Sequence, residues 1–201
     1  MSDAVDTRSI AGGDDHEAAI TLGEVDIALA WNVRGNAADA PFVSHVQRVL
    51  RLPLPAPMTS TYGEHDALLW LGPRSWLFVA GASATRDDFD AARRAINAAG
   101  GALFDVSSSQ VAWTIRGAAA GRVLNRSCPL DFHPHAFPPG YCAQSMLGHI
   151  NALFHRPDAS PAFVVMVARS YAADAWRALS DSAASDGCSV AARAPFARLS
   201  R

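Results

Sequence analysis

Polar and apolar residues alternate with a period of two along several stretches of the chain. In the stretch 25–33, every second residue is apolar and the residues between them are small or polar: Val25, Ile27, Leu29, Trp31 and Val33 alternate with Asp26, Ala28, Ala30 and Asn32. This period is typical of a β-strand with one buried face. Apolar runs bounded by turn residues predict further strands at 67–71, 76–80, 102–106, 111–115, 164–168 and 188–192, and two short strands within 141–154.

Other stretches have apolar residues three or four positions apart, which is the spacing of a helix with one buried face. They predict helices at 41–50, 89–99, 118–126 and 170–183. Gly100-Gly101 and Asp186-Gly187 follow two of these stretches, and Cys128-Pro129 follows a third. Glycine after a helix and proline beyond it are common stop signals.

Two copies of one pattern indicate an internal repeat. The segments 30–35 and 112–117 both read Ala-Trp, a polar residue, a β-branched residue and Arg-Gly, and each precedes a predicted helix. Both halves then follow the order β-α-β-β-α-β. We therefore predict an α+β fold with duplicated ferredoxin-like halves, 22–107 and 108–193, in one domain at 21–193. We expect residues 1–20 to be poorly ordered and 194–201 to form a C-terminal tail.

Composition narrows the functional classes. The 201 residues carry a net charge of −2, which gives no basic footprint for nucleic acid or an anionic membrane. The densest apolar run, 162–168, is far shorter than the ~20 residues of a membrane-spanning helix. Three cysteines without CxxC spacing argue against a disulfide framework and favour a reducing compartment, the cytoplasm. The acidic N-terminus has no apolar segment typical of a signal peptide.

Side chains that could support chemistry are present but are not arranged in known motifs. Ser107-Ser108-Ser109 is not set in a Gly-x-Ser-x-Gly turn, and no glycine-rich phosphate-binding loop is visible. Four histidines lie near two cysteines, but the spacing lacks the paired ligands of a zinc site. We therefore expect no catalytic residue and no metal site among His133, His135, His149, His155, Cys128 and Cys142.

Several segments, taken in order, resemble the gamma subunits of heterotetrameric sarcosine oxidases. No one segment is specific by itself, but their order and spacing make a chance match improbable. The similarity extends roughly from Ile27 to Ala184. The matching segments are Leu69 to Leu77 (LWLGPRSWL), Asp105 to Ser108 (DVSS), Cys128 to Pro134 (CPLDFHP), Phe137 to Gly140 (FPPG) and Val167 to Tyr171 (VARSY).

The resemblance implies a noncatalytic structural subunit of a larger enzyme. Such a complex oxidatively demethylates sarcosine with oxygen, giving glycine, hydrogen peroxide and methylene-tetrahydrofolate. The partners implied are the alpha, beta and delta subunits. FAD, FMN, NAD and tetrahydrofolate are expected on those other subunits, and zinc is associated with a different subunit, so this chain is expected to bind no cofactor. The implied fold is that of the folate-binding domain of aminomethyltransferases.

A folate site on the chain itself is the main alternative. Such a site needs a carboxylate near the folate amine and an arginine for the glutamate tail, and Asp105 and Arg116 are the candidates. Asp105 could instead cap a turn, and Arg116-Gly117 recurs at Arg34-Gly35, as a feature of the repeated scaffold would. The chain could thus be a stand-alone folate-binding or aminomethyltransferase-like protein. A third alternative is an assembly or regulatory module that kept the fold without a ligand.

Overall fold

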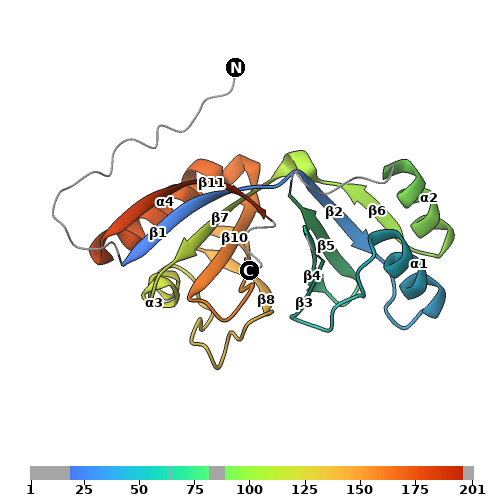
Figure 1. Cartoon of the computed structure of the whole chain (residues 1–201), viewed down its shortest axis with the longest axis horizontal. Coiled ribbons are helices and arrows are strands. Elements are labelled where there is room, and N and C mark those ends of the chain that lie inside the picture. Colours follow the sequence, from blue (N-terminus) through green and yellow to red (C-terminus); the bar gives the residue numbers. More distant parts are fainter. Residues whose placement is uncertain (1–18, 64, 82–88, 197–201) are drawn as a thin grey trace, which may run out of the picture.

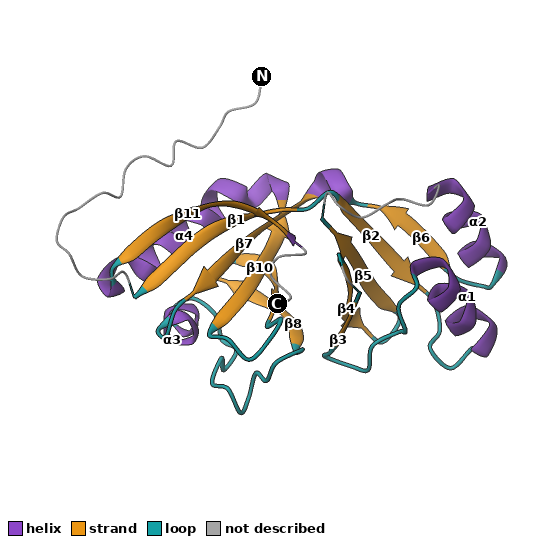
Figure 2. Ribbon diagram, in the orientation of Figure 1, coloured by secondary structure: helices purple, strands orange, loops and turns teal. Residues whose placement is uncertain are grey.

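The computed structural model describes residues 19–63, 65–81 and 89–196, which form eleven strands and four α-helices. The elements lie in four layers, with two β-sheets face to face in the middle and a pair of helices on each outer side (Figure 1). Figure 2 shows the same layers by element type. None of the helices in this part of the chain has the length and apolarity needed to cross a membrane.

The first sheet has the strand order β3-β4-β5-β2-β6, and all its neighbouring strands are antiparallel. Helices α1 and α2 cover its outer face, where Phe42, Val46 and Ile96 are fully buried against the sheet. The elements are β2 (Leu29–Arg34), α1 (Ala40–Leu50), β3 (Ser60–Tyr62), β4 (Asp66–Gly72), β5 (Ser75–Ala80), α2 (Phe89–Ala98) and β6 (Ala102–Asp105).

The second sheet has the order β11-β1-β7-β10-β9-β8. Strands β1 and β11, which come from opposite ends of the chain, pair in parallel, and the other neighbours are antiparallel. Helices α3 and α4 cover its outer face. The elements are β1 (Ile20–Asp26), β7 (Gln110–Arg116), α3 (Ala120–Asn125), β8 (Cys142–Leu147), β9 (Ile150–His155), β10 (Ala162–Ala168), α4 (Ala172–Ala183) and β11 (Cys188–Pro195).

Both faces of the central strands are buried, because each sheet lies between its helices and the other sheet. In β10, Val165 and Val167 pack toward α3 and α4, whereas Val164 and Met166 pack in the core between the sheets. In β5, Trp76 and Phe78 likewise pack toward α1 and α2, whereas Leu77 and Val79 pack in the core between the sheets. The core between the sheets consists of Val25, Ala30, Ala67, Leu69, Leu77, Val79, Ala112, Cys142, Leu153, Val164, Met166 and Phe196.

The structure confirms the α+β class, all four predicted helices and the predicted turns at 72–75 and 147–149. One strand prediction is wrong. The stretch 25–33 is not one strand: the chain leaves the second sheet after Asp26 and enters the first at Leu29. The period-2 pattern continues through this change, although Val25 lies in the core between the sheets whereas Leu29, Trp31 and Val33 pack toward α1 and α2. Such a pattern shows which face is buried, but not which strand is the partner.

The two predicted halves are not separate along the chain. The elements of the first sheet and its two helices follow the predicted order β-α-β-β-α-β along the chain, as β2-α1-β4-β5-α2-β6, with the short β3 in addition. In the second sheet β1, from the start of the chain, is inserted between β7 and β11. Duplication of a ferredoxin-like unit therefore stays a prediction.

The predicted ends of the domain also differ from the structure. Strand β1 begins at Ile20, inside the segment predicted to be poorly ordered, and residues 1–18 lie outside the described part. At the other end, β11 continues to Pro195, and Phe196 is only 4% exposed in the core between the sheets. The predicted tail from 194 thus starts inside the fold, and its last residues, 197–201, are not among those described.

Candidate functional site

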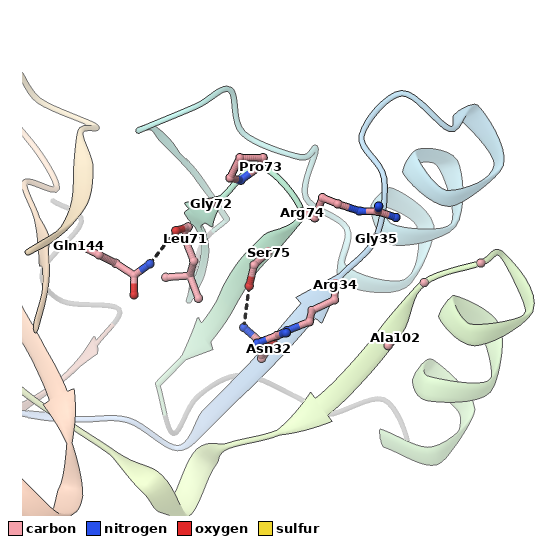
Figure 3. A pocket seen from close by; sticks show the side chains of 12 residues that line it. Asn32, Arg34, Gly35, Leu71, Gly72, Pro73, Arg74, Ser75, Ala102 and Gln144 are labelled. Atoms are coloured by element: carbon pink, nitrogen blue, oxygen red, sulfur yellow. Dashed lines mark hydrogen bonds between the residues drawn. The ribbon is translucent and has the colours of Figure 1, made fainter. Parts of the chain in front are cut away.

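A cleft opens between the two sheets, lined by residues of β2, β4, β5 and β6 on one side and of β8, β9 and β10 on the other. It consists of two adjoining cavities of about 630 and 760 Å³, which share Asn32, Arg34, Leu71 and Gln144 among their lining residues. We call the two together the inter-sheet cleft. Figure 3 shows the smaller cavity, with Arg34 and Asn32 on β2 facing Ser75 on β5, and Gln144 reaching over from the second sheet.

The larger cavity has an apolar floor and a polar rim. Leu77 comes from the first sheet and Leu153 and Met166 from the second, so the floor is continuous with the core between the sheets. Phe104 on the edge strand β6 lines the same cavity and is 51% exposed. The polar rim consists of Asn32, Arg34, Asp105, Gln110, Gln144 and Asn151. This combination is typical of small-molecule sites and of surfaces that receive a partner.

Hydrogen bonds hold the polar side chains of the cleft in place. Asn32 Nδ2 donates to Ser75 Oγ at 3.1 Å, and Arg34 Nε donates to Asn32 Oδ1 at 2.9 Å. Gln144 Nε2 donates to the carbonyl oxygen of Leu71 at 2.6 Å, which links the two sheets across the cleft. The guanidinium of Arg34 forms no ion pair with any carboxylate of the described residues, so a positive charge is available in the cleft.

The two folate candidates predicted from the sequence are not brought together. Asp105 lines the larger cavity, but one of its carboxylate oxygens accepts hydrogen bonds from Ser107 N at 2.9 Å and Ser107 Oγ at 2.5 Å. This is the turn-capping role considered for it. Arg116 is exposed at the far end of β7, roughly 20 Å from Gln110 at the cleft, at about 3.3 Å per residue. Arg34, the counterpart of Arg116 in the repeated motif, lines the cleft instead.

Among the histidines and cysteines singled out in the sequence, Cys142 and His155 lie opposite each other on β8 and β9, whereas His133 and His135 lie in the loop after α3. His133 and His135 are exposed, and their rings stack with 5.3 Å between the ring centroids. The backbone N–H of His135 donates to His133 Nδ1 at 3.4 Å. All three cysteines are free. In residues 19–63, 65–81 and 89–196 no group of three or more His, Cys, Asp or Glu side chains is placed to hold a metal ion.

A buried polar cluster, which no sequence pattern indicated, joins β3 of the first sheet to β9 of the second. Tyr62 on β3 hydrogen-bonds through its hydroxyl to Nε2 of His155 on β9, and Ser60 Oγ lies 2.9 Å from the same hydroxyl, within hydrogen-bond distance. His155 Nδ1 has no partner in the structure. Burial lowers the pKa of His155 to about 3 and raises the pKa of Tyr62, so both groups are neutral at physiological pH.

The neighbouring thiol belongs to the same cluster. Cys142 lies opposite His155 in the β8–β9 pair, and its Sγ donates to the carbonyl oxygen of Thr59 at 3.1 Å. Burial raises the pKa of Cys142 to about 12. A thiol that stays protonated is a poor nucleophile. The arrangement therefore ties β3 of the first sheet to β8 and β9 of the second rather than activating a side chain.

Comparison of sequences identifies the family. The family model described as "Sarcosine oxidase, gamma subunit family" matches residues 34–185. A sarcosine oxidase subunit gamma from Corynebacterium sp. (strain U-96) is 28% identical over 161 residues, covering 78% of this chain and 74% of the relative. The corresponding subunit from Arthrobacter sp. is 30% identical over 162 residues, covering 78% and 73%.

Comparison of structures agrees with this result. A chain in the heterotetrameric sarcosine oxidase from Corynebacterium sp. U-96 in complex with pyrrole 2-carboxylate superposes with a TM-score of 0.75 and 24% identity, covering 88% of this chain and 90% of that one. Glycine cleavage system aminomethyltransferase T from Bartonella henselae has the same fold at a TM-score of 0.62 and 15% identity, with 88% of this chain matching 48% of that protein. The chain therefore belongs to the sarcosine oxidase gamma subunit family.

Proposed function

We propose that this chain is the gamma subunit of a heterotetrameric sarcosine oxidase and stabilises the complex without a catalytic centre of its own. The observation that supports the assignment most strongly is the family match over residues 34–185, which includes all four helices and strands β3 to β10. The complex would oxidatively demethylate sarcosine with oxygen, producing glycine, hydrogen peroxide and methylene-tetrahydrofolate.

The proposal includes partners, cofactors and location. The partners are the alpha, beta and delta subunits, which bind FAD, FMN, NAD and tetrahydrofolate, and the complex works in the cytoplasm. Three free cysteines suit a reducing compartment. The noncatalytic role is supported by two side chains of types that often act in catalysis. His155 and Cys142 lie together, but both are buried and neutral at physiological pH, and they serve to join the two sheets.

Co-expression with the flavin-binding chains of the same genome tests this assignment. An affinity tag on the present chain is expected to retain those chains in a complex of fixed stoichiometry, measured by native mass spectrometry and flavin absorbance. The control places the tag on a flavin-binding chain and omits the present chain. A tagged chain that purifies free of flavin proteins under the same conditions would contradict the assignment.

A second candidate function, folate binding by the chain itself, is favoured by one observation. Asp105 and Arg34, a carboxylate and a guanidinium, line the same cavity of about 760 Å³. That volume lies within the roughly 300–1,000 Å³ common for small-molecule sites. The carboxylate could contact the folate amine, and the guanidinium could contact the glutamate tail. This candidate includes a stand-alone folate-binding or aminomethyltransferase-like protein.

Titration of the isolated chain with tetrahydrofolate tests the second candidate. Asp105→Asn and Arg34→Gln are expected to weaken binding, whereas Arg116→Gln, which removes the same charge at the far end of β7, leaves it unchanged. No binding by the wild-type chain would reject this candidate. If the chain bound neither tetrahydrofolate nor a partner subunit, both candidate functions would be rejected. The third alternative, a module that kept the fold without a ligand, would then remain.

A further inference from the structure

A third cavity, of about 430 Å³, lies on the second sheet at the end of α3, and none of its lining residues also lines the inter-sheet cleft. Helix α3 and the segments before and after it supply one side, through residues that include Ala118 before the helix, Asn125 at its end and Asp131 in the following loop. Arg156, directly after β9, and Phe163 on β10 supply the other side. No role assigned above involves this cavity.

Arg156 is the buried charged residue of this cavity. It is only 6% exposed, although arginine is almost never fully buried without a charged partner. Its Nη1 donates to the carbonyl oxygen of Phe137 at 2.9 Å, and its Nη2 donates to that of Ala159 at 3.4 Å. The guanidinium carbon lies 5.7 Å from the centroid of the Phe163 ring. These contacts hold the side chain in one orientation at the wall of the cavity.

The guanidinium is incompletely satisfied. Arginine has five N–H donors, of which two have acceptors here, and Nε has no hydrogen-bond partner in the structure. No carboxylate in the described part of the chain forms an ion pair with Arg156. A buried charge without a counter-charge is costly, so an anion that enters the cavity would be favoured.

The other charged groups around the cavity are already engaged. Asp131 is exposed, and its Oδ1 accepts the backbone N–H of His133 at 2.8 Å. Arg122 is ion-paired with Asp186. Asp158, two residues after Arg156, accepts hydrogen bonds from the backbone and hydroxyl of Ser160. Asp131 also forms no ion pair with a described residue, but it is exposed to solvent, so Arg156 is the charged group of this cavity that is both buried and without an ion pair.

We propose that the cavity bounded by Arg156, Phe163 and Ala118 binds a carboxylate group. A guanidinium presents parallel N–H donors that match the two oxygens of a carboxylate. The small volume and the apolar Phe163 wall favour a carboxylate on a short chain. Such a group has two possible sources, a small carboxylic acid or an aspartate or glutamate side chain of another subunit.

Arginine side-chain NMR tests the proposal on the full-length chain. With ¹⁵N-labelled arginine, the Nε–H signal of Arg156 is identified by its NOEs to the Phe163 ring and followed during titration with sodium acetate at constant ionic strength. We expect a saturable shift with a Kd between roughly 0.1 and 10 mM, within the affinity that so few atoms allow. Acetamide, which has the same shape without the charge, is expected to give none.

Two tryptophan variants provide the matched comparison, and neither changes Arg156. Ala118→Trp adds bulk at an exposed position that lines the cavity, and we expect at least a tenfold weaker response to acetate. Ala136→Trp adds the same bulk at an exposed position in the following loop, outside the lining, and should bind like the wild type. No saturable shift in the wild type, an equal response to acetamide, or undiminished binding by Ala118→Trp would each overturn the proposal.

The assembled complex distinguishes the two sources, and this arm alone depends on the proposed function. If the Arg156 signal still responds to acetate in the complex, the ligand is a small carboxylic acid. If the response is lost and the Ala118→Trp chain is retained less well than the Ala136→Trp chain, a side chain of another subunit occupies the cavity. If the acetate response is lost but the Ala118→Trp and Ala136→Trp chains are both fully retained in the complex, the proposal for the complex is overturned. If the wild-type chain fails to assemble, only the proposed function is contradicted.

Discussion

The link between Tyr62 and His155 gives the sharpest stability prediction. Tyr62→Phe removes the hydroxyl that hydrogen-bonds to His155 Nε2 and lies 2.9 Å from Ser60 Oγ. Ser60 keeps its 2.7 Å bond to the carbonyl oxygen of Gly140, and its 3.4 Å contact with Nε2 is long. Because His155 Nδ1 already lacks a partner and the side chain is 1% exposed, both ring nitrogens become poorly satisfied in the core.

The expected cost follows from that unsatisfied nitrogen. A buried polar group left without its partner destabilises a protein by about 1–3 kcal/mol. For a chain of this size, each kcal/mol lowers the midpoint of thermal unfolding by roughly 2–4 °C. We therefore expect Tyr62→Phe to lower the free energy of unfolding by about 1–3 kcal/mol and the midpoint by roughly 2–12 °C, at neutral pH.

Urea unfolding followed by tryptophan fluorescence measures this difference, with Tyr141→Phe as the matched control. The Tyr141 hydroxyl donates to Met58 Sδ, a weak acceptor, so its removal should cost under ~1 kcal/mol. Adding His155→Phe to Tyr62→Phe removes both polar partners and should restore part of the lost stability, because no unsatisfied ring nitrogen remains. If Tyr62→Phe were no more harmful than Tyr141→Phe, the structural role assigned to the cluster would be refuted.

Three further predictions concern stability. Burial holds the pKa of His155 at about 3 in the folded chain, below its unfolded value of ~6.5, so between these pH values only the unfolded chain binds the extra proton. The free energy of unfolding should therefore fall by up to ~1.4 kcal/mol per pH unit as the pH drops below ~6.5. Urea unfolding of a His155→Phe variant should lack this pH-dependent component. A Cβ at Gly101 would lie 2.5 Å from Phe42 Cε2, so Gly101→Ala should cost about 1–3 kcal/mol in thermal unfolding, whereas Gly72→Ala, with open space around its Cβ, should cost almost nothing; equal effects would contradict the close packing. Met166→Ala in the core between the sheets should cost about 2–5 kcal/mol, and a loss under ~1 kcal/mol would show that this core is not tightly packed.

The helices and most strands could be predicted because each has one face in an apolar layer. The helical spacing in α1 follows from the burial of Phe42, Val46 and Leu50. In β7, residues 112–115 are all buried, and the alternation arises because the large apolar Trp113 and Ile115 pack toward the helices. The assignment of β1 to the second sheet could not be predicted, since a strand has the same period of two whichever sheet it joins. Strand β3 was also missed, because its three residues are only half-buried and follow a proline-rich loop.

The candidate site was harder to predict than the fold. The repeated Arg-Gly motif supplied two equivalent arginines, and only the three-dimensional arrangement separates Arg34 in the cleft from Arg116 at the far end of β7. Tyr62 and His155 are 93 positions apart, so nothing local in the sequence connects them. Arg156 lies just after a strand, and its burial depends on backbone carbonyls from two loops.

Sarcosine-dependent formation of hydrogen peroxide tests the central claim most directly. The flavin-binding chains are expressed with and without the present chain, and peroxide is measured per mole of flavin at equal concentration. We predict that omission of this chain abolishes assembly or lowers the rate, and that adding the purified chain restores it. An unchanged rate and an unchanged complex without this chain would contradict its role as a structural subunit of the oxidase.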